Sequence, residues 1–360
     1  MTLDVLLPLK FDHPFTYNVP KDISVKVGDF VLVPFQNKDI IGVVWGKSSP
    51  IKSSIKIKDI KKKFDFASLS KDTLIFLEKF SRYNLVDLGI TLKLFIFKKA
   101  FKEISKKKKP EESFKEYSLK KDISFDGSQK KAIKILDDQI SFDKFSTVLL
   151  HGITGSGKTL IYFKKIQDFL KKGYQVLVLL PEIALTNQIK ERFKEYFGNY
   201  PALWHSDISE KNKRLIWHGI ANHKINLVLG ARSSLFLPFK KLGLIIIDEE
   251  HDQSYKQEDQ VIYNARDMAV LMASIKKISV ILVSATPSIE TYYNTVNKKF
   301  SYISLDKRYG DAELPEVKFV DLKKNPPLKS KFISSSIIPE LKNILDKGNQ
   351  ILFFLNRRGY

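Results

Sequence analysis

The chain has 360 residues, 43% of them hydrophobic, and contains no cysteine. No apolar run approaches the roughly 18 residues that a membrane-spanning helix needs, and the first residues carry an acid where a secretory signal carries positive charge. These features predict a cytoplasmic globular protein with no membrane partner. They exclude disulfides and cysteine-ligated metal sites in these residues.

The formal net charge is +21 at neutral pH. Such a surplus favours a polyanionic partner such as nucleic acid. Most of the basic residues are lysine, however, so a general bias of composition explains the charge equally well. Charge alone leaves both explanations open.

Short apolar runs at residues 4–7, 15–19, 29–33 and 40–44 predict the strands of a small β-rich domain. Helical spacing follows from 71 to 97, and a run of lysines and glutamates at 106–112 then breaks it. We therefore expect a domain at residues 1–99 and a basic linker at 100–122. The lysines of the linker either contact phosphates or belong to a simple tether.

From residue 125 onward, short apolar runs alternate with helical stretches, which is typical of a parallel sheet with helices on both faces. The runs lie at 147–150, 176–180, 227–229, 244–247 and 280–283. Strands of this kind are buried on both sides, and ligands bind at their carboxyl ends. The residues that directly follow each run are therefore the candidates for chemistry.

The first of these strands leads into a loop with the pattern G-x-x-x-x-G-K-[ST]. In such a loop the backbone N–H groups surround a β-phosphate, Lys158 reaches the β- and γ-phosphates, and the hydroxyl of Thr159 ligates Mg²⁺. The pattern predicts a nucleoside triphosphate site. Its residues are Gly152, Ile153, Thr154, Gly155, Ser156, Gly157, Lys158 and Thr159.

Three acids and a histidine follow the apolar run at 244–247. Beside a phosphate loop, Asp248 is placed to hold the magnesium ion and Glu249 to orient and deprotonate the attacking water. An acidic run after a strand is also typical of a helix N-terminus. His251 is interpreted as a relay between the nucleotide and a neighbouring element rather than as a metal ligand.

Six further segments accompany the phosphate loop. They are residues 181–186 (PEIALT), 230–236 (GARSSLF), 248–257 (DEEHDQSYKQ), 265–267 (ARD), 284–287 (SATP) and 353–360 (FFLNRRGY). Together these motifs resemble the primosomal protein N′ (PriA) family, the replication-restart DNA helicases of superfamily two, across nearly the whole chain.

The resemblance implies a RecA-like α/β motor lobe at 123–325, preceded by a β-rich module that binds a DNA 3′ end and followed at 330–360 by the start of a second lobe, with a strand at 350–355. It implies ATP-dependent 3′-to-5′ unwinding, recognition of stalled or abandoned replication forks, and ATP and Mg²⁺ as cofactors. The implied partners are forked or single-stranded DNA, single-strand-binding protein and other primosome proteins.

The resemblance also assigns residues to DNA binding, or to coupling between DNA and nucleotide. Phe15 and Tyr17 either flank a terminal base or belong to a core, and Tyr255 and Tyr263 are candidates to stack on bases. Gln129 either reads adenine or is a first-turn helix residue beside a Ser cap. The remaining candidates are Thr186, Arg232, Ser233, His251, Arg266, Ser284 and Thr286.

Longer relatives carry a winged-helix domain, a cysteine-rich zinc ribbon and a complete second lobe with an arginine finger. These 360 residues do not contain those features, so the resemblance predicts a C-terminally truncated chain. Such a chain would bind ATP and DNA but hydrolyse and unwind poorly, and zinc would belong to longer relatives only. The alternatives are a non-hydrolysing adaptor that binds DNA forks and a motor that acts on RNA.

Overall fold

The computed structural model describes residues 1–48, 57–101, 124–308, 316–329 and 331–354. Contacts divide the chain into two compact units, Met1–Gly310 and Asp311–Tyr360. Most of the predicted basic linker falls at 102–123, outside the described residues. In the described residues no helix is long and apolar enough to cross a membrane.

The first unit begins with an antiparallel five-stranded sheet in the order β2-β1-β4-β3-β5. Its strands are β1 (Thr2–Leu6), β2 (Phe15–Asn18), β3 (Asp29–Phe35), β4 (Lys38–Lys47) and β5 (Lys62–Ser68). The first four strands match the predicted runs, whereas β5 was not predicted. Alternating residues of β1, β3 and β4, such as Val5, Val31 and Val44, are fully buried in one core.

Two helices, α1 (Lys71–Asn84) and α2 (Leu88–Phe95), follow this sheet. Ser70 caps the start of α1, and Leu85 ends the helix in the left-handed conformation with φ 54°. Both helices pack on the part of the chain that follows: Lys276 Nζ donates to Thr73 Oγ1 at 2.8 Å, and Phe80 and Phe95 contact Phe236. The N-terminal β domain is therefore joined to the next domain through a shared apolar core.

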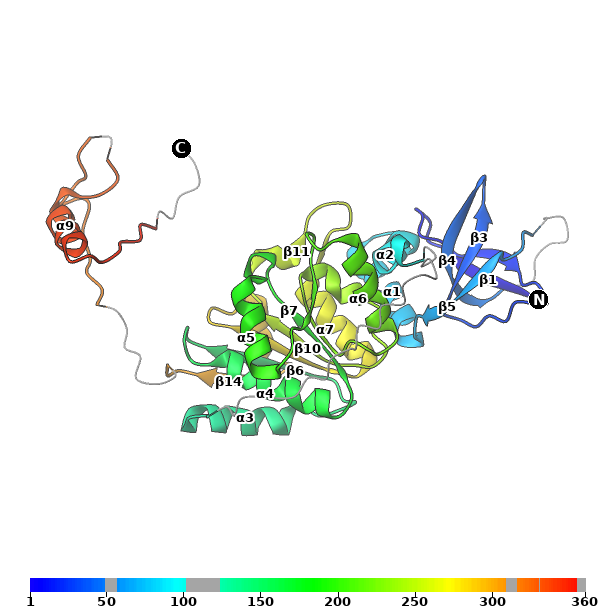
Figure 1. Ribbon diagram of the computed structural model, residues 1–360, viewed down its shortest axis with the longest axis horizontal. Helices are drawn as coiled ribbons and strands as arrows, with labels where there is room; N and C mark the ends of the chain where they lie inside the picture. The colour runs from blue at the N-terminus through cyan, green and yellow to red at the C-terminus, as the bar shows by residue number, and fades with distance from the viewer. Residues whose placement is uncertain (49–56, 102–123, 309–315, 330, 355–360) are drawn as a thin grey trace. The chain divides into compact units, whose positions relative to one another are not determined.

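The larger domain contains a parallel seven-stranded sheet in the order β14-β6-β13-β10-β7-β9-β8 (Figure 1). Its strands are β6 (Ser146–Gly152), β7 (Gln175–Leu179), β8 (Ala202–Trp204), β9 (Leu227–Gly230), β10 (Leu242–Asp248), β13 (Ser279–Ser284) and β14 (Ser301–Leu305). The predicted α/β class is confirmed, and so are the five predicted strands. The two edge strands, β8 and β14, were not predicted.

Helices cover both faces of this sheet because successive residues of a strand point to opposite sides. Residues such as Val148 and Ile246 pack under α3 (Gly127–Gln139), α4 (Lys158–Lys171) and α5 (Asn187–Phe197). Residues such as Leu149 and Ile245 pack under α6 (Glu210–Ala221) and α7 (Ala265–Lys276). The short helix α8 (Ile289–Val296) leads into β14, and β11 (Lys256–Gln257) pairs with β12 (Tyr263–Asn264) beside α7.

The second unit is described by residues 316–329 and 331–354, in which the regular elements are a short 3₁₀ turn (Ser335–Ile337) and α9 (Ile338–Asp346). The strand predicted at 350–355 is wrong for residues 350–354, and residue 355 lies outside the described residues. Leu352 and Phe354 are 93% and 83% exposed, and none of the strands in the described ranges pairs with this apolar run.

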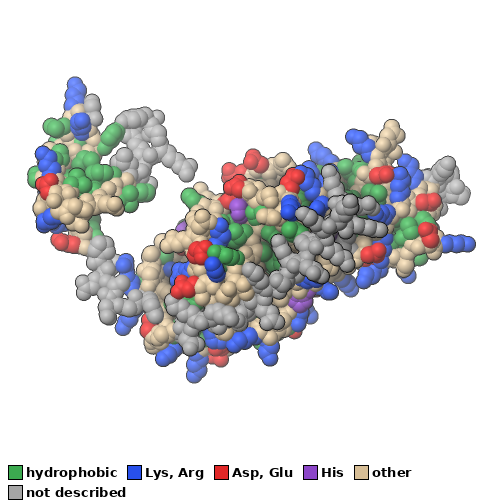
Figure 2. All heavy atoms as spheres, in the orientation of Figure 1, with side chains coloured by type: hydrophobic (Ala, Val, Ile, Leu, Met, Phe, Trp, Pro, Cys, Tyr) green, Lys and Arg blue, Asp and Glu red, His purple; other side chains and the backbone are tan. Residues whose placement is uncertain are grey.

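Lysine and arginine side chains are scattered over the face drawn in Figure 2, among apolar and acidic groups. The charge surplus is thus spread over the elements visible there. On this face it does not mark a single binding patch.

Candidate nucleotide site and nucleic-acid interface

The carboxyl edge of the seven-stranded sheet brings the sequence motifs together. The phosphate loop follows β6, the acidic run follows β10, and β13, which ends at Ser284, lies between these two strands. The other half of the same edge is formed by β7, β9 and β8, after which come Glu182, Arg232 and His205. One edge therefore carries two neighbouring groups of candidate residues.

The phosphate loop has a backbone that requires glycine. Gly155 and Gly157 have φ values of 82° and 81°, in the left-handed region that glycine adopts without strain. A Cβ on Gly152 would lie 2.6 Å from Ser156 Oγ and 2.9 Å from Leu305 Cβ. Gly157 also precedes the first residue of α4, so the positive end of that helix faces the loop.

Lys158 already lies inside this loop. Its Nζ donates to the carbonyl oxygens of Gly152 at 2.6 Å and Ile153 at 3.2 Å. Burial lowers the pKa of Lys158, and the nearby carboxylates of Glu249 and Asp248 oppose that shift. The hydroxyl of Ser156 is buried and has no hydrogen-bond partner in the described part of the chain. Glycine backbone, ammonium and unpaired hydroxyl together fit a polyphosphate.

Asp248 ends β10 and is fixed by two donors. The Tyr162 hydroxyl donates to Asp248 Oδ2 at 2.9 Å, and the Glu249 N–H donates to Oδ1 at 3.1 Å. Burial raises the pKa of Asp248 to about 6, although the Tyr162 hydrogen bond pulls it the other way. The group is therefore mostly ionised at neutral pH. With Thr159, which lies at the start of α4, it supplies oxygen ligands suited to Mg²⁺.

Glu249 leaves the strand in the left-handed conformation with φ 48°, which is uncommon for a residue other than glycine. Its side chain is 46% exposed, and its Oε2 lies 3.7 Å from His251 Nδ1. Of the three acids, Glu249 thus has the accessible carboxylate next to Asp248. This position suits a base that accepts a proton from water.

Glu250 has a structural role that the sequence did not reveal. It is 1% exposed and accepts hydrogen bonds from Ser288 N–H at 2.7 Å, Thr291 Oγ1 at 2.8 Å and Arg266 Nη1 at 3.1 Å. Arg266 was predicted to bind DNA or to couple DNA to nucleotide. The DNA part is wrong in this conformation because its guanidinium lies in this buried pair, whereas the coupling part stays a prediction.

His251 and Ser284 link the acidic run to the end of β13. His251 Nδ1 and Ser284 Oγ share a hydrogen bond of 2.7 Å, and Thr286 N–H donates to the same oxygen at 3.0 Å. Ser284 is fully buried, whereas Thr286 is exposed. Two motifs that are distant in sequence therefore share one hydroxyl, and their part in coupling remains a prediction.

Gln129 is fully buried at the first turn of α3. Its Oε1 accepts from Asp126 N–H at 3.2 Å, and its Nε2 donates to the Ser156 carbonyl at 3.1 Å. The helix-cap alternative describes these contacts, although the cap is Asp126 and not Ser128. Adenine recognition by Gln129 stays a prediction, and the bond to Ser156 ties α3 to the phosphate loop.

The other half of the edge carries the residues assigned to nucleic acid. Thr186 accepts from Ile189 N–H at 3.5 Å and caps α5. Arg232 Nη1 donates to the carbonyls of Ser254 at 3.0 Å and Lys256 at 3.3 Å, and Ser233 is exposed. The arginine thus joins β9 to the loop after the acidic run. Phosphate contacts by these three residues remain predictions.

Base stacking by Tyr255 and Tyr263 is wrong for this structure because both rings are buried, at 1% and 3% exposure. The Tyr255 hydroxyl donates to the carbonyls of Asp248 at 2.6 Å and Leu179 at 3.0 Å. Tyr263 packs against Phe80 and Phe236. Aromatic residues in a loop were interpreted as exposed, but these two supply core contacts between β10, α1 and the loop.

In the N-terminal β domain the two aromatic candidates, Tyr17 and Phe15, differ in burial. Tyr17 is 4% exposed and belongs to the core, which was one of the two alternatives. Phe15 is half-buried and packs edge to face with Phe11 and Phe35, at centroid distances of 5.1 and 5.0 Å. Phe15 therefore keeps an accessible edge, and its contact with a terminal base stays a prediction.

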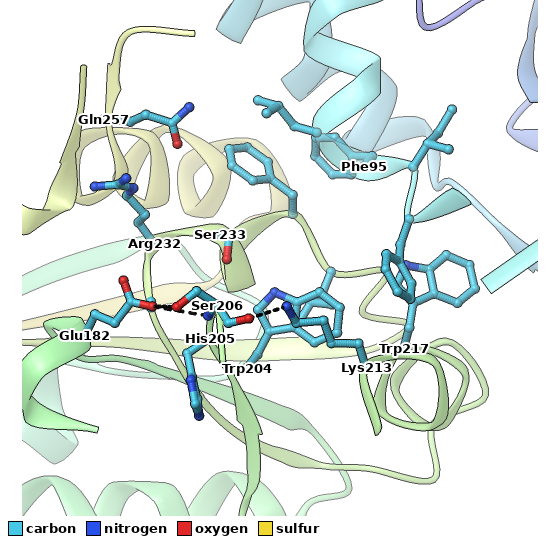
Figure 3. Close-up of a pocket in the computed structure, with 16 residues that line it drawn as sticks. Phe95, Glu182, Trp204, His205, Ser206, Lys213, Trp217, Arg232, Ser233 and Gln257 are labelled. Atoms are coloured by element: carbon cyan, nitrogen blue, oxygen red, sulfur yellow. Dashed lines mark hydrogen bonds between the residues drawn. The ribbon is translucent and has the colours of Figure 1, made fainter. Parts of the chain in front are cut away.

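A cavity of about 350 Å³ lies beside Arg232 and Ser233 (Figure 3). Phe97, Trp204, Ser206 and Lys213 also line it, and sequence reasoning did not single out any of them. In the structure Trp204 is the last residue of the three-residue strand β8, and Ser206 lies two residues beyond it at the same edge. That strand was too short to be predicted.

Two segments of the chain match described domain families. Residues 4–96 match the 3′DNA-binding domain (3′BD), and residues 127–295 match the DEAD/DEAH box helicase family. The chain is 42% identical over 359 residues to the replication restart protein PriA of Rickettsia felis, covering 99% of this chain and 54% of that protein. The chain thus spans about half the length of the curated relatives that it matches along its whole length.

Other relatives match a shorter part of the chain. The PriA proteins of Haemophilus influenzae and Bacillus subtilis are 44% identical over 216 residues and 40% identical over 233 residues; the matches cover 60% and 64% of this chain and 29% of each of those proteins. Among solved structures, one described as RecG bound to a three-way DNA junction has 22% sequence identity and a TM-score of 0.39, covering 54% of this chain and 25% of that chain.

Proposed function

Because this chain is a relative of the replication restart proteins PriA, with their 3′DNA-binding domain and a DEAD/DEAH box helicase domain, we propose that it acts as an ATP-dependent 3′-to-5′ DNA helicase or translocase at stalled or abandoned replication forks. Its relatives are named for replication restart. In this proposal the partners are forked or single-stranded DNA, single-strand-binding protein and other primosome proteins.

The observation that carries the proposal is the meeting of three strand ends. The phosphate loop after β6, Ser284 at the end of β13, and Asp248 and Glu249 at the end of β10 lie on adjacent strands. The sequence separates them widely, and the parallel sheet brings them to one edge. This arrangement supports the use of ATP. The ammonium group of Lys158, the oxygen atoms of Thr159 and Asp248 that suit Mg²⁺, and the accessible carboxylate of Glu249 all lie around one glycine-rich loop.

The proposed chemistry follows from the positions of these groups. Lys158 exchanges its bonds to the Gly152 and Ile153 carbonyls for the β- and γ-phosphates, while the loop N–H groups hold the β-phosphate. When bound by Thr159 and Asp248, Mg²⁺ neutralises charge on the phosphates. Glu249 orients the attacking water and accepts its proton. His251 then couples the nucleotide site to Ser284 through the hydrogen bond that the two side chains share.

The proposed DNA contacts lie on the two domains. Arg232, Ser233 and the N-terminal end of α5 at Thr186 are placed to hold backbone phosphates. In the N-terminal β domain, Phe15 keeps an accessible edge for a terminal base, and Lys10, Lys21 and Lys38 are candidates for phosphate contacts. The match of residues 4–96 to a 3′DNA-binding domain supports this assignment.

The test is ATP hydrolysis and strand separation measured with and without forked DNA that has a free 3′ end. We expect the 360 residues to bind ATP and the fork but to release phosphate and separate strands weakly, and we expect a longer protein with a complete second lobe to be strongly stimulated by the fork. Lys158→Ala should remove that stimulation while fork binding persists. A longer protein that binds the fork but does not hydrolyse ATP would be the non-hydrolysing adaptor. Equal stimulation by RNA would favour the motor that acts on RNA.

A further inference from the structure

The cavity beside Arg232 is separate from the nucleotide site. It lies at the carboxyl ends of β7, β9 and β8, whereas the phosphate loop and Asp248 lie at β6 and β10. Residues from the end of α2 and the turn after it form one wall, and residues after the three strands form the others. Its volume of about 350 Å³ is within the range of small-ligand sites.

Aromatic and aliphatic side chains form the inner wall (Figure 3). Phe97 and Leu94 are half-buried, and Trp204 meets Phe97 edge to face with centroids 6.0 Å apart. Phe95 and Phe236 close the wall behind them, with 3% and 4% exposure. A nucleic-acid base stacks well on such a surface, because every base has a π face and because the contact removes apolar surface from water.

The polar side of the cavity carries charges of both signs. Arg232 and Lys213 are cationic, and Lys213 Nζ donates to the Ser206 carbonyl at 2.8 Å. Glu182 Oε1 accepts from Ser206 N–H at 3.1 Å and from the Ser206 hydroxyl, and these bonds lower the pKa of Glu182. The glutamate is therefore ionised at neutral pH. Glu182 is exposed, whereas Arg232 and Lys213 are half-buried, so the carboxylate opposes a phosphate on its own side of the cavity and the two cations favour a phosphate on theirs.

The geometry points to a binding site for one unstacked base of single-stranded DNA, with the base against Phe97 and Trp204 and its phosphate near Arg232 and Lys213. This inference rests on the proposed function, since it names the part of the DNA strand that binds at the carboxyl ends of β7, β9 and β8. The wall includes Leu94 to Ile96, the last residues of the match to the 3′DNA-binding domain, and Phe97, which directly follows them; the rest lies within the match to the helicase family. A base held here would therefore lie where the two matched segments meet.

The experiment is an abasic scan. The ligand is a DNA duplex with a short single-stranded arm, so the junction fixes the register, and a fluorescent label reports affinity. Each arm position is replaced in turn by an abasic nucleotide that keeps the phosphate. We expect one position to weaken binding to the unaltered protein by about tenfold, since stacking of one base contributes on the order of 1–3 kcal/mol.

Phe97→Leu removes the ring but keeps an apolar side chain. We expect this variant to bind the intact arm about tenfold more weakly and to lose its sensitivity to the abasic position. The matched control is Phe145→Leu, because Phe145 is 38% exposed and lies beside the start of β6, at the opposite edge of the sheet. As a second readout, 2-aminopurine at the sensitive position should lose emission on binding to the unaltered protein and to Phe145→Leu, but not to Phe97→Leu.

The outcomes separate this inference from the proposed function. If the unaltered protein binds the arm, and the abasic scan is flat or Phe97→Leu behaves as the control does, the base site is wrong while DNA binding stands. If the unaltered protein does not bind the DNA at all, both proposals fail. Melting temperatures of the two variants within a few degrees of the unaltered protein establish that the comparison concerns binding and not folding.

Discussion

The two halves of the sheet edge are built differently. In the nucleotide half, the key side chains are held by short bonds to their neighbours: Lys158 to Gly152, Asp248 to Tyr162 and His251 to Ser284. In the other half, the bonds from Arg232 and Lys213 to backbone carbonyls are of similar length, but these two side chains line a cavity of about 350 Å³. The nucleotide half holds its side chains against one another around the glycine loop, whereas the other half leaves room for a larger partner.

The two halves also differ in how well a sequence motif predicts their geometry. Phosphate chemistry requires particular backbone angles, and the glycine spacing of residues 152–157 records them directly. Stacking requires only that a ring be accessible, which a sequence does not record. Tyr255 and Tyr263 were expected to be accessible and are buried, whereas Phe97, which had not been considered, lines the cavity.

The largest expected effect concerns the base in the nucleotide half. In a longer protein that contains a complete second lobe, Glu249→Gln should reduce DNA-stimulated ATP hydrolysis by about 10²–10⁴-fold, because the attacking water loses its proton acceptor, while ATP binding persists since Asp248 and Thr159 remain. Phosphate release and nucleotide affinity measure the two effects. Glu258→Gln, which changes an exposed carboxylate paired with Lys256, is the control. Normal turnover in Glu249→Gln would remove this residue from the mechanism.

The next effect tests whether Glu250 stabilises the fold, in contrast to the catalytic role proposed for Glu249. Glu250→Ala should lower the free energy of unfolding by about 3 kcal/mol, because Arg266 keeps only Asp267 as an ion-pair partner and the donors of Ser288 and Thr291 lose their buried acceptor. Chemical denaturation measures this change. Glu258→Ala removes a surface ion pair and should cost less than about 1 kcal/mol. Equal stability of the two variants would show that the buried network does not stabilise the fold.

Lys158 distinguishes the two halves by ligand. Lys158→Ala should weaken binding of an ATP analogue by about 100-fold, because a charge-assisted contact to phosphate is lost, and should leave affinity for single-stranded DNA unchanged. Calorimetric titration measures the first and fluorescence anisotropy the second. Lys171→Ala, at the far end of α4, is a matched control because Lys171 is exposed. Nucleotide affinity that does not depend on Lys158 would contradict the assignment of the loop.

The smallest effect concerns the buried tyrosine. Tyr255→Phe should destabilise the protein by about 1 kcal/mol, because the Asp248 and Leu179 carbonyls lose their shared donor, and it should not change DNA affinity. Tyr83→Phe, at an exposed ring, is the control and should change neither quantity. A large loss of DNA affinity in Tyr255→Phe, without loss of stability, would restore the tyrosine as a DNA contact.

Much of the fold was predictable because buried parallel strands produce continuous apolar runs, as at 244–247 and 280–283. The edge strands were not, since β8 has three residues and β14 alternates between buried and exposed positions. The strand predicted at 350–355 is wrong for residues 350–354, because a strand needs a neighbour and sequence pattern alone does not show whether there is one.

In the site, the phosphate loop and Asp248 could be predicted because each motif encodes its own local geometry. The pair of Glu250 and Arg266 could not, because only the fold brings the end of β10, the start of α7 and the cap of α8 at Ser288 together. The cavity was also beyond prediction. Its wall joins Phe97 to Trp204, and only the docking of α2 on the larger domain makes these rings meet.

The central claim is that one edge of the sheet binds Mg²⁺ and ATP at β6 and β10 and binds DNA at β7, β9 and β8. Calorimetric titration of a non-hydrolysable ATP analogue into the protein, with and without Mg²⁺ and with and without single-stranded DNA, tests it most directly. We expect one nucleotide site that requires Mg²⁺, and DNA that binds at the same time as the nucleotide. Nucleotide and DNA that compete for a single site, or an analogue that does not bind with Mg²⁺ present, would contradict the account.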